Sequence, residues 1–404
     1  MKSFFYKALL LTGLCAVNAE AISLYDTAPS VGLPESHAAK YYAYVRVGYD
    51  TNMNASSIDE QASPYANAGI GATFADYESV DKISYRFNLG ATRYAKAASN
   101  GSSVSSKKMY ADCGLTASIV HAFNSRSSYM ASLSVTYSPE PEYASGISAS
   151  RRQGDCLNWS FSNSYNQSID SRWSWNVNGV YSGNLYSETE YQGDNRQYVG
   201  GGAGLNYRAS ELLSYNVNLS YRHDLRNEGY DSDNITATVG FRRSLDPVSS
   251  CSASVGVQTK YVHTESILSP VLNLGYNRRV SEGFSANFYL ALSNENVDTY
   301  RGVGANYLSD LAWRVGTNCS YTLSPDVSFT FGFSLMRSSY TKGTGRLEDE
   351  TNMMISPSIG MDYKFTERLR GSINYAYTWY ESDRDSGDSD YTRHNISTGL
   401  NYTF

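Results

Sequence analysis

The five histidines of the chain are the side chains best suited to acid–base catalysis, and they are His37, His121, His223, His263 and His394. A hydrolytic site would need a serine, a histidine and a carboxylate within hydrogen-bonding reach of one another. Only His223 and Asp224 are adjacent in the sequence. Neighbouring residues of a β-strand point to opposite faces, and no Gly-x-Ser-x-Gly sequence occurs, so we predict that the protein is not an enzyme.

Cysteines and clustered carboxylates are the residues that could bind a metal ion. Beyond the N-terminal region the cysteines are Cys113, Cys156, Cys251 and Cys319, and none belongs to the Cys-x-x-Cys pair typical of zinc or redox sites. The acidic segment 383–390 offers carboxylate oxygens to Ca²⁺, but its spacing is not that of an EF-hand loop. We therefore expect no metal site and no cofactor.

The charged residues of the remaining chain lie in segments where polar and apolar residues alternate. In the segments 83–91, 213–221 and 327–335 the odd positions are apolar and the even positions are polar or small. A period of two places successive side chains on opposite faces of a β-strand. Such segments are about 9–14 residues long, and a tilted strand needs about 9–11 residues to cross a bilayer.

Aromatic residues mark the ends of many of these segments. The chain contains 36 Tyr, 14 Phe and 5 Trp, and pairs such as Tyr41 and Tyr49, or Trp173 and Tyr181, are placed like girdle residues at two membrane interfaces. No apolar run beyond the N-terminus reaches the ~18 residues of a membrane-spanning helix. Among sheets, only a closed barrel satisfies every backbone polar group in hydrocarbon. We therefore predict an all-β, closed antiparallel transmembrane β-barrel.

The C-terminus carries the most specific motif. The chain ends Ser-Thr-Gly-Leu-Asn-Tyr-Thr-Phe, with Gly399, Tyr402 and Phe404 on an alternating segment. This end resembles the C-terminal assembly signal of Gram-negative outer-membrane proteins, and nearly the whole mature chain resembles the outer-membrane β-barrel porins. The resemblance implies location in the outer membrane, contact with its lipid and lipopolysaccharide, and recognition of Tyr402 and Phe404 by the barrel-assembly machinery.

The links between the segments set the strand count. Short links alternate with long polar links, like the periplasmic turns and external loops of such barrels, and they give about 18 strands between residues 40 and 404. A count of 16 stays open, because the link 263–265 is short where an external loop is expected. Residues 1–21 are predicted to be a signal peptide, cleaved after residue 19 or 21, and residues 22–39 a short periplasmic lead-in.

Side-chain parity separates a lipid-facing set from a lumen-facing set. Residues such as Val45, Val47, Phe87 and Val217 are predicted to face lipid. The charged residues of the other face are the pore-lining candidates: Arg46, Arg86, Asp112, Arg222, Arg242, Lys260, Arg314 and Asp362. Within this set only Asp112 and Asp362 oppose the basic residues, which favours a weak anion preference.

The external link 138–154 is a candidate constriction, because the third external loop of general porins folds into the pore. It contains Glu140, Glu142, Arg151 and Arg152. Several other external links are acidic, and we expect them to bridge divalent cations to lipopolysaccharide.

A barrel of 16–18 strands is too wide for side chains to fill, so the sequence predicts a porin-like channel for passive diffusion of small hydrophilic solutes. Two other functions stay open: a surface barrel without transport, such as a structural protein or adhesin, and an export barrel for a polysaccharide. No basic patch suits nucleic acid. The sequence leaves open whether the protein forms a homo-oligomer.

Overall fold

The computed structural model describes residues 38–53, 55, 60–77, 81–96, 108–139, 155–295, 307–343, 349–383 and 390–404. The predicted signal peptide, and all but the last two residues of the predicted lead-in, lie outside these ranges. In the described part of the chain almost every residue belongs to one antiparallel sheet. None of its helices is long and apolar enough to cross a membrane.

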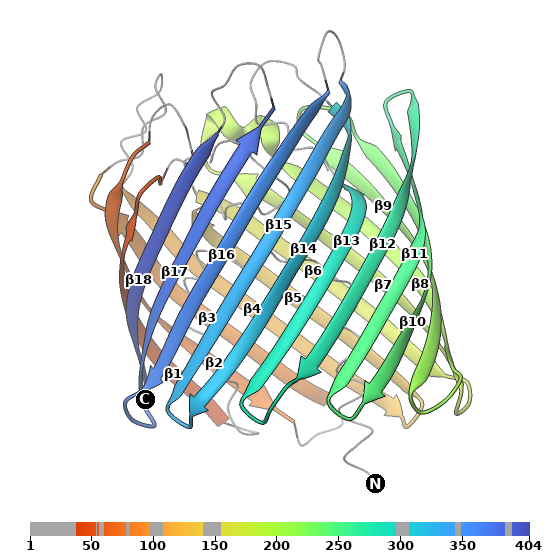
Figure 1. Cartoon of the computed structure of the whole chain (residues 1–404), viewed down its shortest axis with the longest axis horizontal. Coiled ribbons are helices and arrows are strands. Elements are labelled where there is room, and N and C mark those ends of the chain that lie inside the picture. The colour runs from red at the N-terminus through yellow and green to blue at the C-terminus, as the bar shows by residue number, and fades with distance from the viewer. Residues whose placement is uncertain are drawn as a thin grey trace.

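The sheet contains eighteen strands, and each pairs with its neighbours in the chain (Figure 1). The strands are β1 (Ala38–Asp50), β2 (Ser63–Asp76), β3 (Asp81–Tyr94), β4 (Met109–Asn124), β5 (Ser127–Pro139), β6 (Asp155–Ser168), β7 (Trp173–Tyr186), β8 (Arg196–Arg208), β9 (Leu213–Arg226), β10 (Ser232–Asp246), β11 (Ser249–Val262), β12 (Glu265–Arg279), β13 (Phe284–Glu295), β14 (Tyr307–Ser324), β15 (Val327–Gly343), β16 (Glu350–Lys364), β17 (Leu369–Ser382) and β18 (Tyr391–Thr403). The predicted count of 18 is confirmed, and the first strand begins two residues before the predicted boundary at residue 40.

The first and last strands close the sheet into a barrel. Their antiparallel register runs from Tyr42 opposite Thr403 to Asp50 opposite Asn395. The backbone N–H of the terminal Phe404 adds one more bond, to the Tyr41 carbonyl at 2.9 Å. The sheet therefore has no free edge strand, as a membrane-spanning sheet requires.

A buried ion pair crosses this closing seam. The guanidinium of Arg393 on β18 donates through Nε to Asp50 Oδ1 of β1 at 2.7 Å and through a second nitrogen to Asp50 Oδ2. Both side chains are almost completely buried. The bidentate geometry is the strong form of an arginine–carboxylate contact, and it joins the two ends of the barrel sequence.

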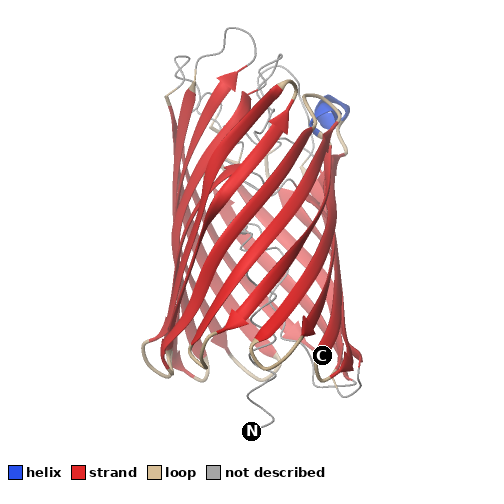
Figure 2. Cartoon of the chain, turned by 90° about the vertical axis from the view of Figure 1, so that its right-hand side faces the viewer, coloured by secondary structure: helices blue, strands red, loops and turns tan. Residues whose placement is uncertain are grey.

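The two rims of the barrel differ in their connections. At the rim where β1 begins, here called the turn rim, the links are short, and Figure 2 shows them as tight turns. In one of them, Asp170 Oδ1 accepts the backbone N–H of Arg172 at 2.6 Å and of Trp173 at 2.7 Å. These bonds hold the pKa of the Asp170 carboxyl below its usual range.

The opposite rim, here called the loop rim, carries the longer links and the short helix η2 (Thr189–Asp194), drawn in blue in Figure 2. One link at this rim is short, since only residues 263–264 join β11 to β12. His263 adopts a left-handed backbone conformation there, with φ of 54°. That conformation lets the chain reverse within two residues, so a short external link is compatible with eighteen strands.

Candidate functional site

The inner face of the barrel wall is the candidate site, and side-chain exposure identifies it. On β1, Val45 and Val47 are 46% and 50% exposed on the apolar outer face, so Arg46 lies on the inner face. The same parity puts all eight predicted pore-lining residues on the inner face, in β1, β3, β4, β9, β10, β11, β14 and β16: Arg46, Arg86, Asp112, Arg222, Arg242, Lys260, Arg314 and Asp362.

Tyrosines and glycines form cross-strand pairs on the inner face of β1 and β2. The register sets Tyr42 opposite Gly71, Tyr44 opposite Gly69 and Tyr65 opposite Gly48. A Cβ atom at any of these three glycines would lie within 2.6 Å of the facing phenol. The rings therefore lie flat over the glycine backbone, and any larger residue at these positions would displace them.

Asp112 is held at the edge of this tyrosine group. Its Oδ2 accepts the Asn67 amide at 3.1 Å and the Tyr44 hydroxyl at 3.4 Å, and the Asn67 amide also donates to Thr92 Oγ1 at 2.8 Å. Asp112 is only 3% exposed. The predicted wall carboxylate is therefore fixed within a hydrogen-bonded network rather than standing in lumen water.

Arg46 and Asp362 belong to another part of the wall, across the closing seam. Register neighbours connect them along one row: Asp362 lies opposite Ser372, Ser372 opposite Gly399, and Gly399 opposite Arg46. Gly399 of the C-terminal motif thus faces inward. Tyr402 and Phe404 lie on the outer face, with ring centroids 5.1 Å apart.

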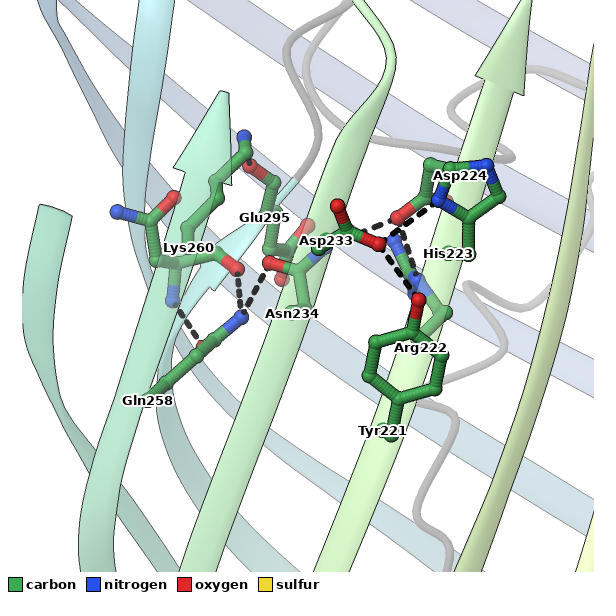
Figure 3. A network of polar contacts seen from close by, with 10 residues as sticks. Tyr221, Arg222, His223, Asp224, Asp233, Asn234, Gln258, Lys260 and Glu295 are labelled. Atoms are coloured by element: carbon green, nitrogen blue, oxygen red, sulfur yellow. Dashed lines mark hydrogen bonds and ion pairs between the residues drawn. The ribbon is translucent and has the colours of Figure 1, made fainter. Parts of the chain in front are cut away.

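Arg222 and Lys260 belong to a polar network near the loop rim (Figure 3), and Arg314 joins it through Glu295. Arg222 Nε donates to Asp224 Oδ2 at 2.9 Å, and the Asn234 amide donates to the same oxygen at 2.9 Å. The Arg222 guanidinium also lies 4.9 Å from the centre of the Tyr198 ring. Its charge is therefore balanced by a neighbouring carboxylate and its position is fixed by the ring.

The end of β13 leaves β12 and is held by side chains of β11. The β12–β13 ladder stops at Leu272 opposite Leu292. Beyond it, Gln258 Nε2 donates to the Asn294 carbonyl at 2.9 Å, and the Asn294 N–H donates to Gln258 Oε1 at 3.2 Å. The amide of Gln258 thus provides the two bonds that a neighbouring strand would provide.

A proline in β12 accounts for the end of that ladder. Pro270 lies two residues from Leu272 and has no N–H to donate to a neighbouring strand. Lys260 completes the attachment of β13, because its ammonium donates to the Glu295 carbonyl at 3.1 Å. Lys260 is 3% exposed, so this predicted pore-lining charge builds the wall and does not stand in the lumen.

The charge balance predicted for the wall needs a correction. The sequence interpretation set only Asp112 and Asp362 against the basic residues. In the structure further carboxylates lie on the inner face, among them Asp50, Asp224, Glu295, Asp310 and Glu350. Arg314 Nε donates to Glu295 Oε1 at 2.7 Å, with a second contact to Oε2. Asp224 shares the parity of Arg222 on one strand and could have been recognised from the sequence. Glu295 is the last residue of β13.

His223 is bound on the outer face, away from Asp224. Its Nδ1 lies 2.8 Å from Asp233 Oδ1 on β10, and that oxygen also accepts the Tyr221 hydroxyl at 2.6 Å (Figure 3). Asp224 points to the inner face, as the alternation of a strand requires. The cross-strand partner Asp233 was missed from the sequence, because pairing between strands depends on register.

The candidate constriction residues Glu140, Glu142, Arg151 and Arg152 lie outside the described residues, as do Asp385 and Asp388 of the acidic segment 383–390.

Residues 248–404, which contain β11 to β18, match the family model of the outer membrane protein beta-barrel domain. The closed barrel and this match place the protein in the outer membrane. The short turns of such barrels face the periplasm and the longer loops face outward, so the turn rim is periplasmic and the loop rim external. No curated protein matches the chain.

Several solved structures resemble the chain over most of its length at low sequence identity. OccAB4 of Acinetobacter baumannii is 12% identical with a TM-score of 0.48, over 92% of this chain and 99% of that chain. OpdK of Pseudomonas aeruginosa, solved with vanillate, is 10% identical with a TM-score of 0.49, over 91% of this chain and 100% of that chain. These similarities are too low to carry a function from one protein to another.

Proposed function

We propose that this outer-membrane β-barrel is a channel for passive diffusion of small hydrophilic solutes, with a weak preference for anions. The observation that carries the proposal is the closed wall of eighteen strands with polar and charged side chains on its inner face. A barrel with a polar interior and an apolar exterior is the arrangement of water-filled membrane channels.

The size of the wall supports an aqueous lumen. Eighteen strands spaced about 4.8 Å apart and tilted by about 40° enclose a barrel roughly 36 Å wide between opposite backbones. Side chains of the wall alone cannot fill that width. Passage of a solute then needs no binding energy or conformational work from the wall.

The charge pattern supports a weak preference rather than a strong one. Arginines and a lysine of the inner face attract anions into the lumen. However, Arg222 and Arg314 bind Asp224 and Glu295, and Lys260 is buried in the wall. Compensated charges focus less field on a passing ion than isolated charges do.

Conductance across a planar bilayer tests the proposal. The purified barrel, added to a bilayer in potassium chloride, is expected to produce discrete open steps with a linear current–voltage relation. Absence of steps from protein that shows the heat-modifiable gel mobility of a folded barrel would overturn the proposal and favour a structural protein or adhesin. Current that only an acidic polysaccharide blocks would favour polymer export.

A further inference from the structure

Four asparagines on the inner face of β7 and β9 form an uncharged surface, here called the amide patch: Asn176, Asn178, Asn216 and Asn218. Their position follows from parity, because Val177 and Val217 between them are exposed on the outer face. Asn178 and Asn218 are exposed, and Asn176 and Asn216 are half-buried. The patch is therefore accessible from the lumen.

Glycines of β8 allow the amides to converge. Gly204 lies opposite Asn176 on one side and opposite Asn218 on the other. A Cβ atom at Gly204 would lie 2.5 Å from Asn176 Oδ1 and 2.6 Å from Asn218 Oδ1, so both amides lean over the strand between them. Gly202 has the same relation to Asn178, whose Oδ1 would lie 3.2 Å from a Cβ atom. The result is a continuous amide surface over three strands, about 10 Å across.

The patch retains most of its hydrogen-bonding capacity. Among the described residues the four amides share one hydrogen bond, from Asn218 Nδ2 to Asn216 Oδ1 at 3.3 Å. Each side-chain amide has two donor hydrogens and an acceptor oxygen. Charged residues of these strands lie at the ends of the patch, where Arg222 is paired with Asp224 toward the external rim and Arg208 ends β8 at the periplasmic rim.

We infer that the amide patch is a binding surface for neutral polyhydroxylated solutes, such as short saccharides, within the proposed channel. A sugar hydroxyl both donates and accepts hydrogen bonds, and an amide surface offers both partners without charge. The four amides themselves offer no counter-ion, so a charged solute bound on them would lose hydration without a compensating ion pair. The inner-face charge beside the patch is Arg242 of β10, which lies opposite Ser214, whereas Asn216 lies opposite Gly240. The inference rests on the proposed channel function and adds a solute class to it.

Raffinose is the probe for this site, and a poly(ethylene glycol) of similar hydrodynamic size is its control. Single-channel current through the wild-type protein should fall in a saturable manner as raffinose rises. The polymer has no row of hydroxyl donors and should only reduce the conductivity of the solution, without saturation. If channels open normally and raffinose acts like the polymer, the inference fails while the channel function stands. If no channels form, both fail.

Paired substitutions locate the binding. The double variant Asn178→Ala/Asn218→Ala should weaken raffinose binding by about tenfold or more, because it removes both exposed amides of the patch; tenfold corresponds to about 1.4 kcal/mol. The matched control is Asn287→Ala/Asn318→Ala, an exposed pair of inner-face amides directly opposite each other on β13 and β14. Its raffinose affinity should equal that of the wild type.

An equal loss of raffinose affinity in both double variants would overturn the assignment of binding to the amide patch. An unchanged affinity in Asn178→Ala/Asn218→Ala would overturn it as well. Heat-modifiable mobility confirms that each variant has folded. Should the alanine pair fail to fold, the single change Asn178→Ser keeps a small polar residue on β7 and should still reduce affinity, whereas unchanged affinity there would count against the inference.

Discussion

At the scale of single residues, the inner wall consists of side chains that fit one particular neighbour. Tyr44 lies over Gly69 and reaches Asp112, and Arg393 reaches Asp50 across the seam. Each partner comes from another strand, so these contacts form only when the strands are in register. Such pairs contribute to the specificity of the barrel as well as to its stability.

Arg393→Met is expected to destabilise the folded barrel, by roughly 3–5 kcal/mol of unfolding free energy, because it leaves the buried Asp50 carboxylate without its charged partner. The double variant Asp50→Leu/Arg393→Met removes both charges and should recover much of that loss. Urea titration in phospholipid vesicles, followed by tryptophan fluorescence, measures both. Equal stability of the single variant and the wild type would show that the pair contributes nothing to closure.

Replacement of Phe404 by serine should impair assembly while export to the periplasm continues. The ring stands 68% exposed on the outer face beside Tyr402, where a folding factor could contact it. Heat-modifiable mobility of the membrane fraction reports the folded share, and Leu323→Ser, another exposed apolar change at a periplasmic strand end, serves as the control. Normal assembly of the Phe404 variant would contradict the assigned role of the C-terminal motif.

At the scale of strands, the β12–β13 ladder is the shortest in the barrel, with eight register pairs, and it leaves out the external end of β13. Its external end is attached to β11 by the side chains of Gln258 and Lys260. Side-chain amides are a weaker and more local substitute for a backbone ladder. This strand end should therefore open more readily than the rest of the wall.

Gln258→Ala should increase hydrogen exchange at the Asn294 amide by about tenfold, which corresponds to about 1.4 kcal/mol of lost local stability. The reason is the loss of the acceptor Gln258 Oε1 together with the donor to the Asn294 carbonyl. Mass spectrometry of peptides that contain residue 294 gives the rate. Gln197→Ala, which removes an outer-face bond to Tyr181, is the control and should leave that peptide unchanged. An unchanged rate in the Gln258 variant would show that other contacts hold β13.

At the scale of the whole molecule, the lumen wall is not uniform around the barrel. Tyrosines, Asp112 and the seam ion pair lie on β18 and β1–β4, the amide patch lies on β7–β9, and the charge network that holds the end of β13 lies on β9–β14. A solute in a wide, hydrated lumen meets these sectors separately, because charges beyond about 8–10 Å are screened at physiological salt. Selectivity is then a sum of small local effects.

A salt gradient across a planar bilayer should give a reversal potential that indicates a modest anion preference, and this preference should decrease as salt concentration rises. The physical reason is the excess of basic residues on the inner face, reduced by the pairs Arg222–Asp224 and Arg314–Glu295. Arg46→Gln should shift the potential toward zero. A clear cation preference at low salt would show that carboxylates outweigh the basic wall.

The amino-acid sequence by itself determined the architecture. Alternation with a period of two, girdle aromatics and the alternating link lengths depend on local chemistry. They predicted the barrel and about eighteen strands, with sixteen left open. Parity is also local, so the inner-face position of residues such as Arg46 and Arg86 followed from their apolar neighbours.

The tertiary structure decided which residues act together. The partners Asp50 and Arg393 are separated by most of the chain, and Glu295 and Arg314 by an external link. The register between strands and the departure of β13 from β12 bring these partners into contact. Neither structural feature can be inferred from a single segment of the sequence. The convergence of Asn176 and Asn218 over Gly204 likewise exists only once three strands are aligned, because pairing across a sheet is a property of neighbours in space.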